Sequence, residues 1–586
     1  MPLPRPPSPP SRARRRASGG GRGSPPTRSP PAPGPSADRT TPRGIPKGSR
    51  GRWPRDPSAA SAIPRATSRP SRSFSPATTR ASSRATSSTS TAARTSGSAR
   101  QLDRWAWKCC ALTARRVVAT TAPVATSTHS ASAGTADASA GAAGSARDLQ
   151  HATWTLAWPV IFSFSIESFV GLCDMLMVGR LGPRAVAGVG VGVQILGGVD
   201  SVMFAVGTGT LAIVARQVGG RDLRGAEETL GQSILAAMAL SLLAVVPVRA
   251  WAPALVGAFH VQPEVVPVGV SFLRIVMLGV PAGAALFVMI ASLRGAGDTR
   301  TPLLIGLVVG VVNVLLAYVL IFGRLGLPAL GVAGAAIATT VAFASGAVVG
   351  LALLARGKLV LALRGWPLPP RVDVIRRVLR IGYPAAIEHL LMQVGFFLYI
   401  VFAAHHGTAA VAAYFIGVRI LALSFLPGFG FAAAAATLIG QSLGAGRPDE
   451  AERSGREAVR LAVRLMTVCG IVIFVAARPI ARLFVDDAAV VTDAVSFIRV
   501  LAACQPLMAT DFTLGGALRG AGDTRFPLAA VFLGFYVCRL GFAGLVTFGL
   551  GLSVLWLWLA LVGDYLVRSV LKGWRFRSGT WKQVVV

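Results

Sequence analysis

The chain has 586 residues, of which 52% are hydrophobic and only 14% charged, and its mean hydropathy is +0.57. This composition is typical of an integral membrane protein and excludes an ordinary soluble domain. The net charge of +34 does not indicate nucleic-acid binding, because residues 1–150 hold 25 Lys and Arg against 5 Asp and Glu and so carry +20 of it. The six cysteines match neither zinc-ligand spacing nor a disulfide framework.

Residues 1–149 are rich in Arg, Ser, Pro, Ala and Thr and have no apolar run that could build a core. We expect this segment to be a disordered leader. A solvated tail, an organellar transit peptide, a nucleic-acid-binding arm and a start site placed too early all remain open. The tail and the misplaced start are preferred because this composition cannot fold, and no nucleic-acid partner is expected.

From Trp154 onward, apolar stretches of about 20 residues follow one another, each long enough to cross a bilayer as a helix. The predicted fold class is therefore an all-α integral membrane protein. Twelve transmembrane helices are expected, at 154–178, 186–210, 229–249, 266–290, 302–322, 329–354, 379–403, 409–436, 458–477, 491–515, 527–548 and 550–570.

A ten-residue motif occurs twice, as LRGAGDTRTP at Leu293–Pro302 and as LRGAGDTRFP at Leu518–Pro527. The offset is 519 − 294 = 225 residues, and the same offset carries Pro159 onto Pro384. One register kept over most of each half indicates two copies of one six-helix unit, with parallel orientation because six is even. The predicted domains are the leader 1–149, an N-lobe 150–365 with helices 1–6, and a C-lobe 366–586 with helices 7–12.

Lys and Arg are concentrated in the loops that follow even-numbered spans, which places those loops, both motif copies and both termini in the cytoplasm. The protein is expected to be a multi-pass protein of the cytoplasmic membrane. The longest cytoplasmic connection runs from Arg356 to Arg380 and joins the lobes. Its segment Arg371–Arg380 is predicted to be a short basic amphipathic helix on the membrane surface.

The repeated motif lacks the GxxxxGK[ST] pattern of a phosphate loop and follows no strand, so nucleotide binding is disfavoured. Its glycines are expected to turn the chain, and its first arginine to hold the cytoplasmic face. The next helix is expected to be capped by Asp298 or Thr301 in the first copy, and by Asp523 or Thr524 in the second. These structural loop residues are Arg294, Gly295, Gly297, Asp298, Arg519, Gly520, Gly522 and Asp523. Without an ATPase signature, pumping must use an ion gradient, and no enzyme activity is expected.

Polar residues inside apolar spans carry the functional signal, because an ionisable group in hydrocarbon normally faces a cavity. Glu167 and Asp174 lie seven residues apart, on one face of the first span, and Asn313 lies in the middle of the fifth. We take these three as ion-coupling candidates. Further candidates for substrate or C-lobe ion binding are Tyr318, Glu388, Gln393, Arg419 and Asp511, with His389 a possible partner of Glu388. No metal site or cofactor is expected.

Several of these strings resemble the multidrug and toxic compound extrusion (MATE) transporter family. LRGAGDTRTP is followed by Asn313 and then by IFGRLGLPALGVAGAAIATT at Ile321–Thr340. The opening WPVIFSFSIESFVGLCDMLMVGRLG, which contains Asp174, and the Gly-x-Pro-x-x-x-Glu string that ends at Glu388 also match. The resemblance implies two six-helix lobes around a central cleft and export of cationic, amphipathic compounds in exchange for H+ or Na+ by alternating access. It also implies that Asp174 and Asn313 take part in ion coupling.

The sequence departs from the family pattern at three positions. Ala317 stands where the family is often polar, Met392 where some relatives carry an acid, and Asp511 is displaced by about one turn. Ala317 weakens the case for a complete N-lobe ion-binding cluster, for which Glu167 could compensate. The two C-lobe departures, at Met392 and Asp511, favour proton coupling in the N-lobe over a sodium site in the C-lobe. A lipid-linked polysaccharide flippase and an organic-anion exporter remain alternatives, for which Arg419 and Arg539 are the deep cations available. The expected partners are small molecules and the bilayer, and the expected state is a monomer.

Overall fold

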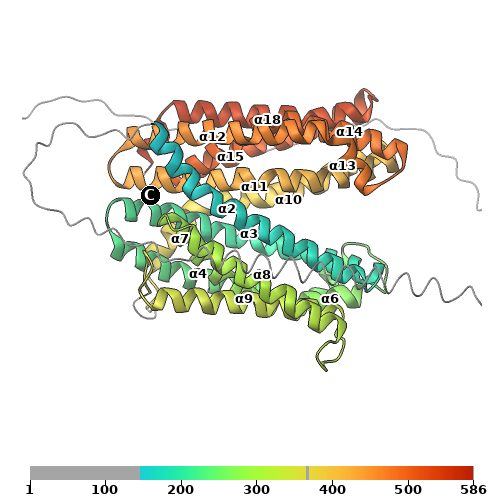
Figure 1. Cartoon of the computed structure of the whole chain (residues 1–586), viewed down its shortest axis with the longest axis horizontal. Helices are drawn as coiled ribbons and strands as arrows, with labels where there is room; N and C mark the ends of the chain where they lie inside the picture. The colour runs from blue at the N-terminus through green and yellow to red at the C-terminus, as the bar shows by residue number, and fades with distance from the viewer. Residues whose placement is uncertain (1–145, 364–368, 585) are drawn as a thin grey trace, which may run out of the picture. The chain divides into compact units, whose positions relative to one another are not determined.

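The computed structural model describes residues 146–363, 369–584 and 586, and within these ranges the chain is helical without a β-strand (Figure 1). Eleven helices are long and apolar enough to cross a membrane, and a twelfth crossing is made if the bent pair α14 (Ala488–Ala503) and α15 (Gln505–Gly520) is one span. The prediction of an all-α membrane protein with twelve spans is confirmed. The expected leader lies outside the described residues, except that 146–149 form the first turn of α2.

The first half of the described chain contains six spans, which are drawn from teal to yellow-green in Figure 1. Its helices are α2 (Ala146–Gly179), α3 (Pro183–Gly219), α4 (Leu223–Ala250), α5 (Ala252–Gly257), α6 (Val266–Val276), η1 (Met277–Gly279), α7 (Val280–Gly295), α8 (Arg300–Phe322) and α9 (Val332–Ala355).

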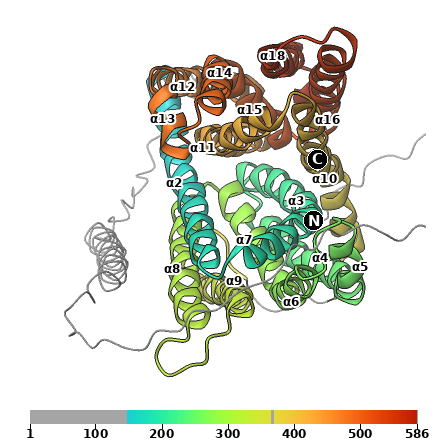
Figure 2. The same ribbon diagram turned by 90° about the vertical axis from the view of Figure 1, so that its right-hand side faces the viewer.

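The second half contains the remaining spans, and Figure 2 shows many of the helices of both halves nearly end-on. Besides α14 and α15 its helices are α10 (Val372–His405), α11 (Thr408–Gly444), α12 (Pro448–Val475), α13 (Ala477–Phe484), α16 (Arg525–Val531), the π-helix η2 (Phe532–Leu540), α17 (Gly541–Gly544), the π-helix η3 (Leu545–Gly549), α18 (Val554–Arg577) and the short 3-10 helix η4 (Thr580–Gln583).

The structure repeats with the offset found in the sequence. Adding 225 to the bounds of α3 gives those of α11, and adding it to the bounds of α4 gives those of α12. The glycines before α3 and α11 have matching positive φ angles, 104° at Gly182 and 99° at Gly407, which favour glycine. One difference between the copies is that α8 is α-helical throughout whereas its counterpart contains η2 and η3.

The expected surface helix at Arg371–Arg380 is not a separate element. The chain from Val372 continues as α10 into the membrane span, because no Pro or Gly interrupts its backbone hydrogen bonds before Gly382. Likewise α12 begins at Pro448 rather than 458, and α18 continues to Arg577 rather than ending at 570. Apolar stretches mark the part of a helix that lies in the bilayer, and polar turns extend these helices beyond it.

The two halves meet closely at one end of the helix bundle, which we call the motif face because both copies of the motif lie there. Thr437 of α11 donates a hydrogen bond to the backbone oxygen of Arg294 at 2.8 Å, and Gln441 donates to that of Gly295 at 2.9 Å. Gln150 of α2 donates to Glu457 of α12 at 2.7 Å. These bonds cross from one half to the other.

Glycine allows the helices of the two halves to touch along their backbones. A Cβ on Gly444 of α11 would lie 2.0 Å from the backbone oxygen of Arg216 in α3. A Cβ on Gly382 of α10 would lie 1.7 Å from the backbone oxygen of Ala205, also in α3. No real side chain tolerates such distances, so these contacts require glycine.

The segment after α18 folds back onto the motif face. Trp581 is fully buried, stacks on Phe576 at 4.9 Å and donates its indole N–H to the backbone oxygen of that residue at 2.8 Å. Arg216 of α3 donates to the backbone oxygen of Val584 at 2.8 Å. This segment therefore contacts both halves.

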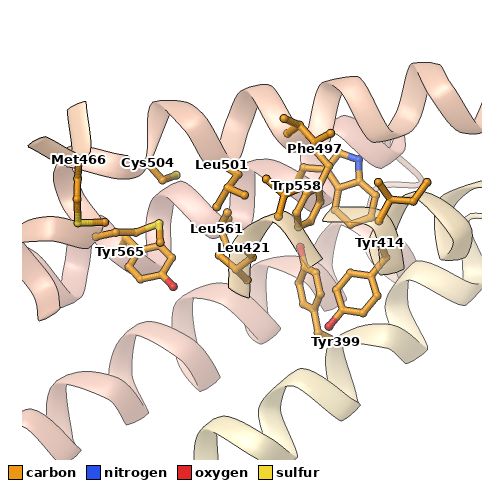
Figure 3. Close-up of a cluster of buried hydrophobic side chains, with 14 of the residues drawn as sticks. Tyr399, Tyr414, Leu421, Met466, Phe497, Leu501, Cys504, Trp558, Leu561 and Tyr565 are labelled. Carbon is orange, nitrogen blue, oxygen red and sulfur yellow. The ribbon is translucent and has the colours of Figure 1, made fainter. Parts of the chain in front are cut away.

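The core of the second half is aromatic. Trp558 is fully buried, lies parallel to Tyr414 at 6.4 Å and meets the ring of Phe497 edge-on at 4.7 Å (Figure 3). Tyr399 lies beside them and donates its hydroxyl to the backbone oxygen of Leu557 at 2.5 Å. This core fixes the relative positions of α10, α11, α14 and α18, and α10 and α18 also carry charged residues of the second half.

Candidate functional site

Each of the two motif loops turns at a glycine whose positive φ angle other residues rarely adopt. Gly297 and Gly522 have φ angles of 92° and 88°. In the first copy, Asp298 Oδ1 accepts hydrogen bonds from the backbone N–H groups of Arg300 and Thr301 at 3.1 and 3.0 Å, which is the expected cap. In the second copy Asp523 instead accepts from Arg575 Nε at 2.8 Å.

The sequence predicted that the first arginine of each motif lies at the cytoplasmic membrane surface. In the structure both side chains point inward instead. The guanidinium of Arg294 turns inward and lies 5.2 Å from the ring centroid of Phe164. Arg519 turns inward and forms an ion pair with Glu388, 2.9 Å from Nη2 to Oε1. Both arginines lie one helical turn or less before a loop, and their long side chains reach acids in the interior.

Three helices of the first half bring Asp174, Asn313 and Thr339 together. The side chain of Asn313 faces Asp174 and donates to Thr339 Oγ1 at 3.3 Å. Asp174 Oδ1 and Asn313 Oδ1 are buried without a hydrogen-bond partner among the described residues. Buried acceptors without a partner are costly, and a proton or a small cation at Asp174 Oδ1 would satisfy that oxygen.

A second polar group in the same half contains Glu167, Arg294 and Asp200. Glu167 interacts electrostatically with Arg294 and with Asp200, and the side chains of Glu167 and Asp200 are exposed although both lie within membrane spans. A charged side chain at such a position faces water rather than lipid. Glu167 therefore belongs to this group and not to the one around Asp174.

Asp200 adjoins the face of α3 that meets α10 of the other half. Its neighbour Ser201 forms a 2.9 Å hydrogen bond with His389 Nδ1, and the imidazole stacks on Phe204 with ring centroids 4.4 Å apart. The amide of Gln393 lies against Gly197, one turn away. The acids Glu167 and Asp200 thus flank the contact between the halves.

The predicted C-lobe acids are placed differently. Asp511 is fully buried and pairs with Lys572 and Arg568, each at 2.6 Å. Glu388 is paired with Arg519, whereas His389 is hydrogen-bonded to Ser201 and interacts with Glu388 only electrostatically. Both acids therefore have cationic partners, although Glu388 Oε2 accepts no hydrogen bond from the described residues.

The remaining predicted residues lie apart from these groups. Tyr318 packs against Phe322, and Arg324 lies over its ring at 5.9 Å. Arg419 is exposed on α11. Arg539 is completely buried inside the second half, 4.2 Å from the ring centroid of Tyr399, and cannot line a cleft.

The sequence analysis missed Asp200 and Thr339, and also Asp564, Arg568 and Lys572 at the C-terminal end of the chain. Asp200 is an ionisable residue within the second predicted span, so the rule that selected Asp174 also selects it. The three α18 residues follow one another at intervals of four and so share one helix face, a pattern visible in the sequence. In the described part of the chain, no group of three or more His, Cys, Asp or Glu residues could hold a metal ion.

The sequence profile of the MatE family matches residues 159–319 and 384–545, which is more than half of the chain. The chain belongs to the MATE transporter family. The two matched stretches begin 225 residues apart and correspond to the two halves. MATE proteins are transporters rather than enzymes, and this chain is a multi-pass membrane transporter with multidrug exporters among its relatives.

Two curated relatives illustrate the similarity. The chain is 28% identical over 435 residues to a probable multidrug resistance protein NorM of Thermotoga maritima, with 74% of this chain and 93% of the relative covered. It is 30% identical over 444 residues to a probable NorM protein of Deinococcus radiodurans, with 71% and 94% covered.

Solved structures share the fold. An outward-facing multidrug resistance MATE transporter of the MOP superfamily matches with a TM-score of 0.69 and 22% identity, covering 74% of this chain and 96% of that one. A MATE protein in complex with MaL6 matches with a TM-score of 0.70 and 23% identity, covering 74% and 98%. At these identities the similarity establishes the architecture.

Proposed function

We propose that this transporter exports organic cations in exchange for protons and that the exchanging carboxylates belong to the first half. The observation that carries the proposal is Asp174, whose Oδ1 is buried without a partner opposite Asn313. A carboxylate in such a place binds a proton or a cation readily, and release of that ion restores the unsatisfied state.

The second group supports the same assignment. Glu167 and Asp200 bring two negative charges together near the contact between the halves, with Arg294 as the nearby cation. With all three ionised, the group carries one net negative charge, which suits a cationic substrate. Protonation of either acid removes that charge, so proton uptake and cation release are linked.

The motif face is cytoplasmic in this proposal, as the Lys and Arg distribution indicates. The halves are joined there by backbone contacts, so the conformation corresponds to a carrier closed toward the cytoplasm. A proton enters from outside, binds at Asp174, displaces the substrate outward, and is released inside after the carrier reorients.

Export of organic anions is the second candidate. Arg419 favours it, because this exposed cation lies within a membrane span of the second half. The flippase alternative loses support, because Arg539, the other deep arginine, is enclosed within the second half.

The test uses the full chain in liposomes, with a pH gradient or a sodium gradient imposed separately. Movement of a fluorescent organic cation such as ethidium under the pH gradient alone is the expected result. Movement only under the sodium gradient contradicts proton coupling. Movement of an anionic dye but not of ethidium, in folded protein, selects the second candidate.

A further inference from the structure

The interior of the second half contains a chain of charged side chains that the proposed mechanism does not use. Asp511 Oδ1 lies 2.6 Å from Lys572 Nζ, and Asp511 Oδ2 lies 2.6 Å from Arg568 Nη2. Asp564 continues the chain, at 3.7 Å from Arg568 Nη1 and 3.8 Å from Arg539 Nη1. These five side chains are at most 3% exposed.

A separate pair, Glu388 and Arg519, adjoins this chain. A Cβ on Gly515 would lie 3.2 Å from Lys572 Nζ and 3.4 Å from both terminal nitrogens of Arg519, so the two cations are neighbours. The complete network has three carboxylates and four cations, and therefore one net positive charge; its members are Glu388, Asp511, Asp564, Arg519, Arg539, Arg568 and Lys572.

The internal repeat relates part of this network to the Asp174 group. Adding 225 carries Asp174 onto Tyr399 and Thr339 onto Asp564. It carries Asn313 onto Cys538, the residue before Arg539. A π-helical turn contains about one residue more than an α-helical turn. In η2 this extra residue makes Arg539, rather than Cys538, the spatial counterpart of Asn313.

The guanidinium of Arg539 thus lies at the C-lobe counterpart of the Asp174 group. Its Cζ is 4.2 Å from the ring centroid of Tyr399 and 4.8 Å from that of Phe535, and its Nη1 faces Asp564. Aromatic faces and a carboxylate are the surroundings that hold a buried cation. Among the described residues, the equivalent place in the first half has a carboxylate oxygen without a hydrogen-bond partner, and Asp174 forms no ion pair there.

We propose that the guanidinium of Arg539 occupies the C-lobe counterpart of the Asp174 group, in the place of a bound cation. Together with Arg568 and Lys572, it prevents exchangeable ions from binding to Asp511 and Asp564. Arginine does not release its proton in proteins, so this occupancy is permanent. A further cation would enter a network that is already positive, which costs free energy in a medium of low dielectric constant. The inference rests on the proposed ion-coupled export and assigns ion exchange to one half alone.

The charge count makes the inference testable. Sodium binding should appear only when cations are removed until the carboxylates outnumber them. The double exchange Arg539→Gln with Lys572→Met leaves two cations against the three carboxylates. The further exchange Asp564→Asn restores equality. Exchange of two exposed arginines, Arg478→Gln with Arg482→Gln, is the matched control, because it removes the same charge outside the network.

The experiment measures the melting temperature of the purified full chain in detergent, with NaCl replaced stepwise by choline chloride at constant ionic strength. We expect sodium to leave the wild-type chain and the matched control unchanged. It should raise the melting temperature of the double variant by about 5 °C, as ligand linkage predicts for a site that is well saturated. Adding Asp564→Asn should abolish the rise.

Two results overturn the inference. One is sodium stabilisation of the wild-type chain that Asp511→Asn or Asp564→Asn removes, and the other is a folded double variant that sodium does not stabilise. If the double variant does not fold, the single exchange Arg539→Glu lowers the charge count equally and is measured in the same way. No gradient is used, so failure of cation export leaves this result valid, and failure here leaves the export assignment valid.

Discussion

The acids of the two halves differ in the cations around them, because Asp511 and Asp564 form ion pairs and Asp174 forms none among the described residues. Asp174 has an unpartnered oxygen, and Glu167 and Asp200 are exposed within their spans. Asp511 and Asp564 are buried among arginine and lysine side chains. Two copies of one unit have therefore kept the same helices and differ in what occupies their interiors. A duplicated transporter can exchange ions in one copy and use fixed charges in the other.

The largest effect is expected from Asp511→Asn. The exchange leaves Lys572 and Arg568 buried beside a neutral amide, and removal of one partner of a buried ion pair costs about 3–5 kcal/mol. We expect low yield and a strongly lowered melting temperature. A variant that melts like the wild-type chain but no longer exports would instead show that Asp511 is an exchanging acid, and the contrast between the halves would fail.

Asp174→Asn should have the opposite effect to Asp511→Asn, because it should lower export and leave the melting temperature nearly unchanged. The amide is close in size to the carboxylate and can still bond with Asn313, so insertion and melting temperature should stay near wild-type values. Export under a pH gradient should fall about 100-fold, at the upper end of typical coupling free energies. Liposome assays check this, and wild-type export would remove Asp174 from the mechanism.

Gly444→Ala tests the closure between the halves. A Cβ would press against the backbone of Arg216, and the overpacking should cost about 1–3 kcal/mol and separate the halves at the motif face. Labelling of an introduced cysteine near that face should become faster. Gly179→Ala is the control, because a Cβ there meets nothing within 4 Å. Equal labelling of both variants would contradict the expected opening.

Asp200→Asn should reduce pH-driven export by about 10-fold, less than Asp174→Asn, because Glu167 keeps the group negative. The double exchange with Glu167→Gln should reduce export further. If Asp200→Asn instead matches the loss in Asp174→Asn, the two groups act as one unit.

The smallest effect is expected at an ion pair outside the membrane. Lys582 lies 2.6 Å from Glu452, and this hydrogen bond raises the pKa of Lys582. A raised pKa means that its contribution is complete at neutral pH and is lost only in the alkaline range above the unfolded value. Lys582→Gln should cost about 0.5–1 kcal/mol, as partly exposed pairs do. Melting curves at pH 7 check this. A loss of stability as large as that of Asp511→Asn would show that burial does not make the ion pairs of Asp511 more important for stability than the partly exposed pair of Lys582.

Hydropathy and the repeat were sufficient to predict the twelve spans, because length and polarity decide whether a helix crosses a bilayer. The helix ends were less predictable, as α12 and α18 extend through polar turns that no bilayer rule describes. Asp174 and Asn313 could be selected because each interrupts an apolar stretch. The partners of Asp511 could not be assigned, because Lys572 lies 61 residues away and reads as part of a basic tail. The inward direction of Arg294 and Arg519 also depends on tertiary packing.

The glycine contacts at the motif face have a consequence for the conditions under which the resting conformation persists. Backbone atoms do not titrate, and salt screens their contacts little, unlike those of exposed charges. A change in pH or salt concentration at the motif face should therefore leave the backbone contacts between the halves at Gly219, Gly382 and Gly444 unchanged. With the cytoplasmic orientation proposed above, the closed conformation therefore persists while the pH and salt concentration of the cytosol vary.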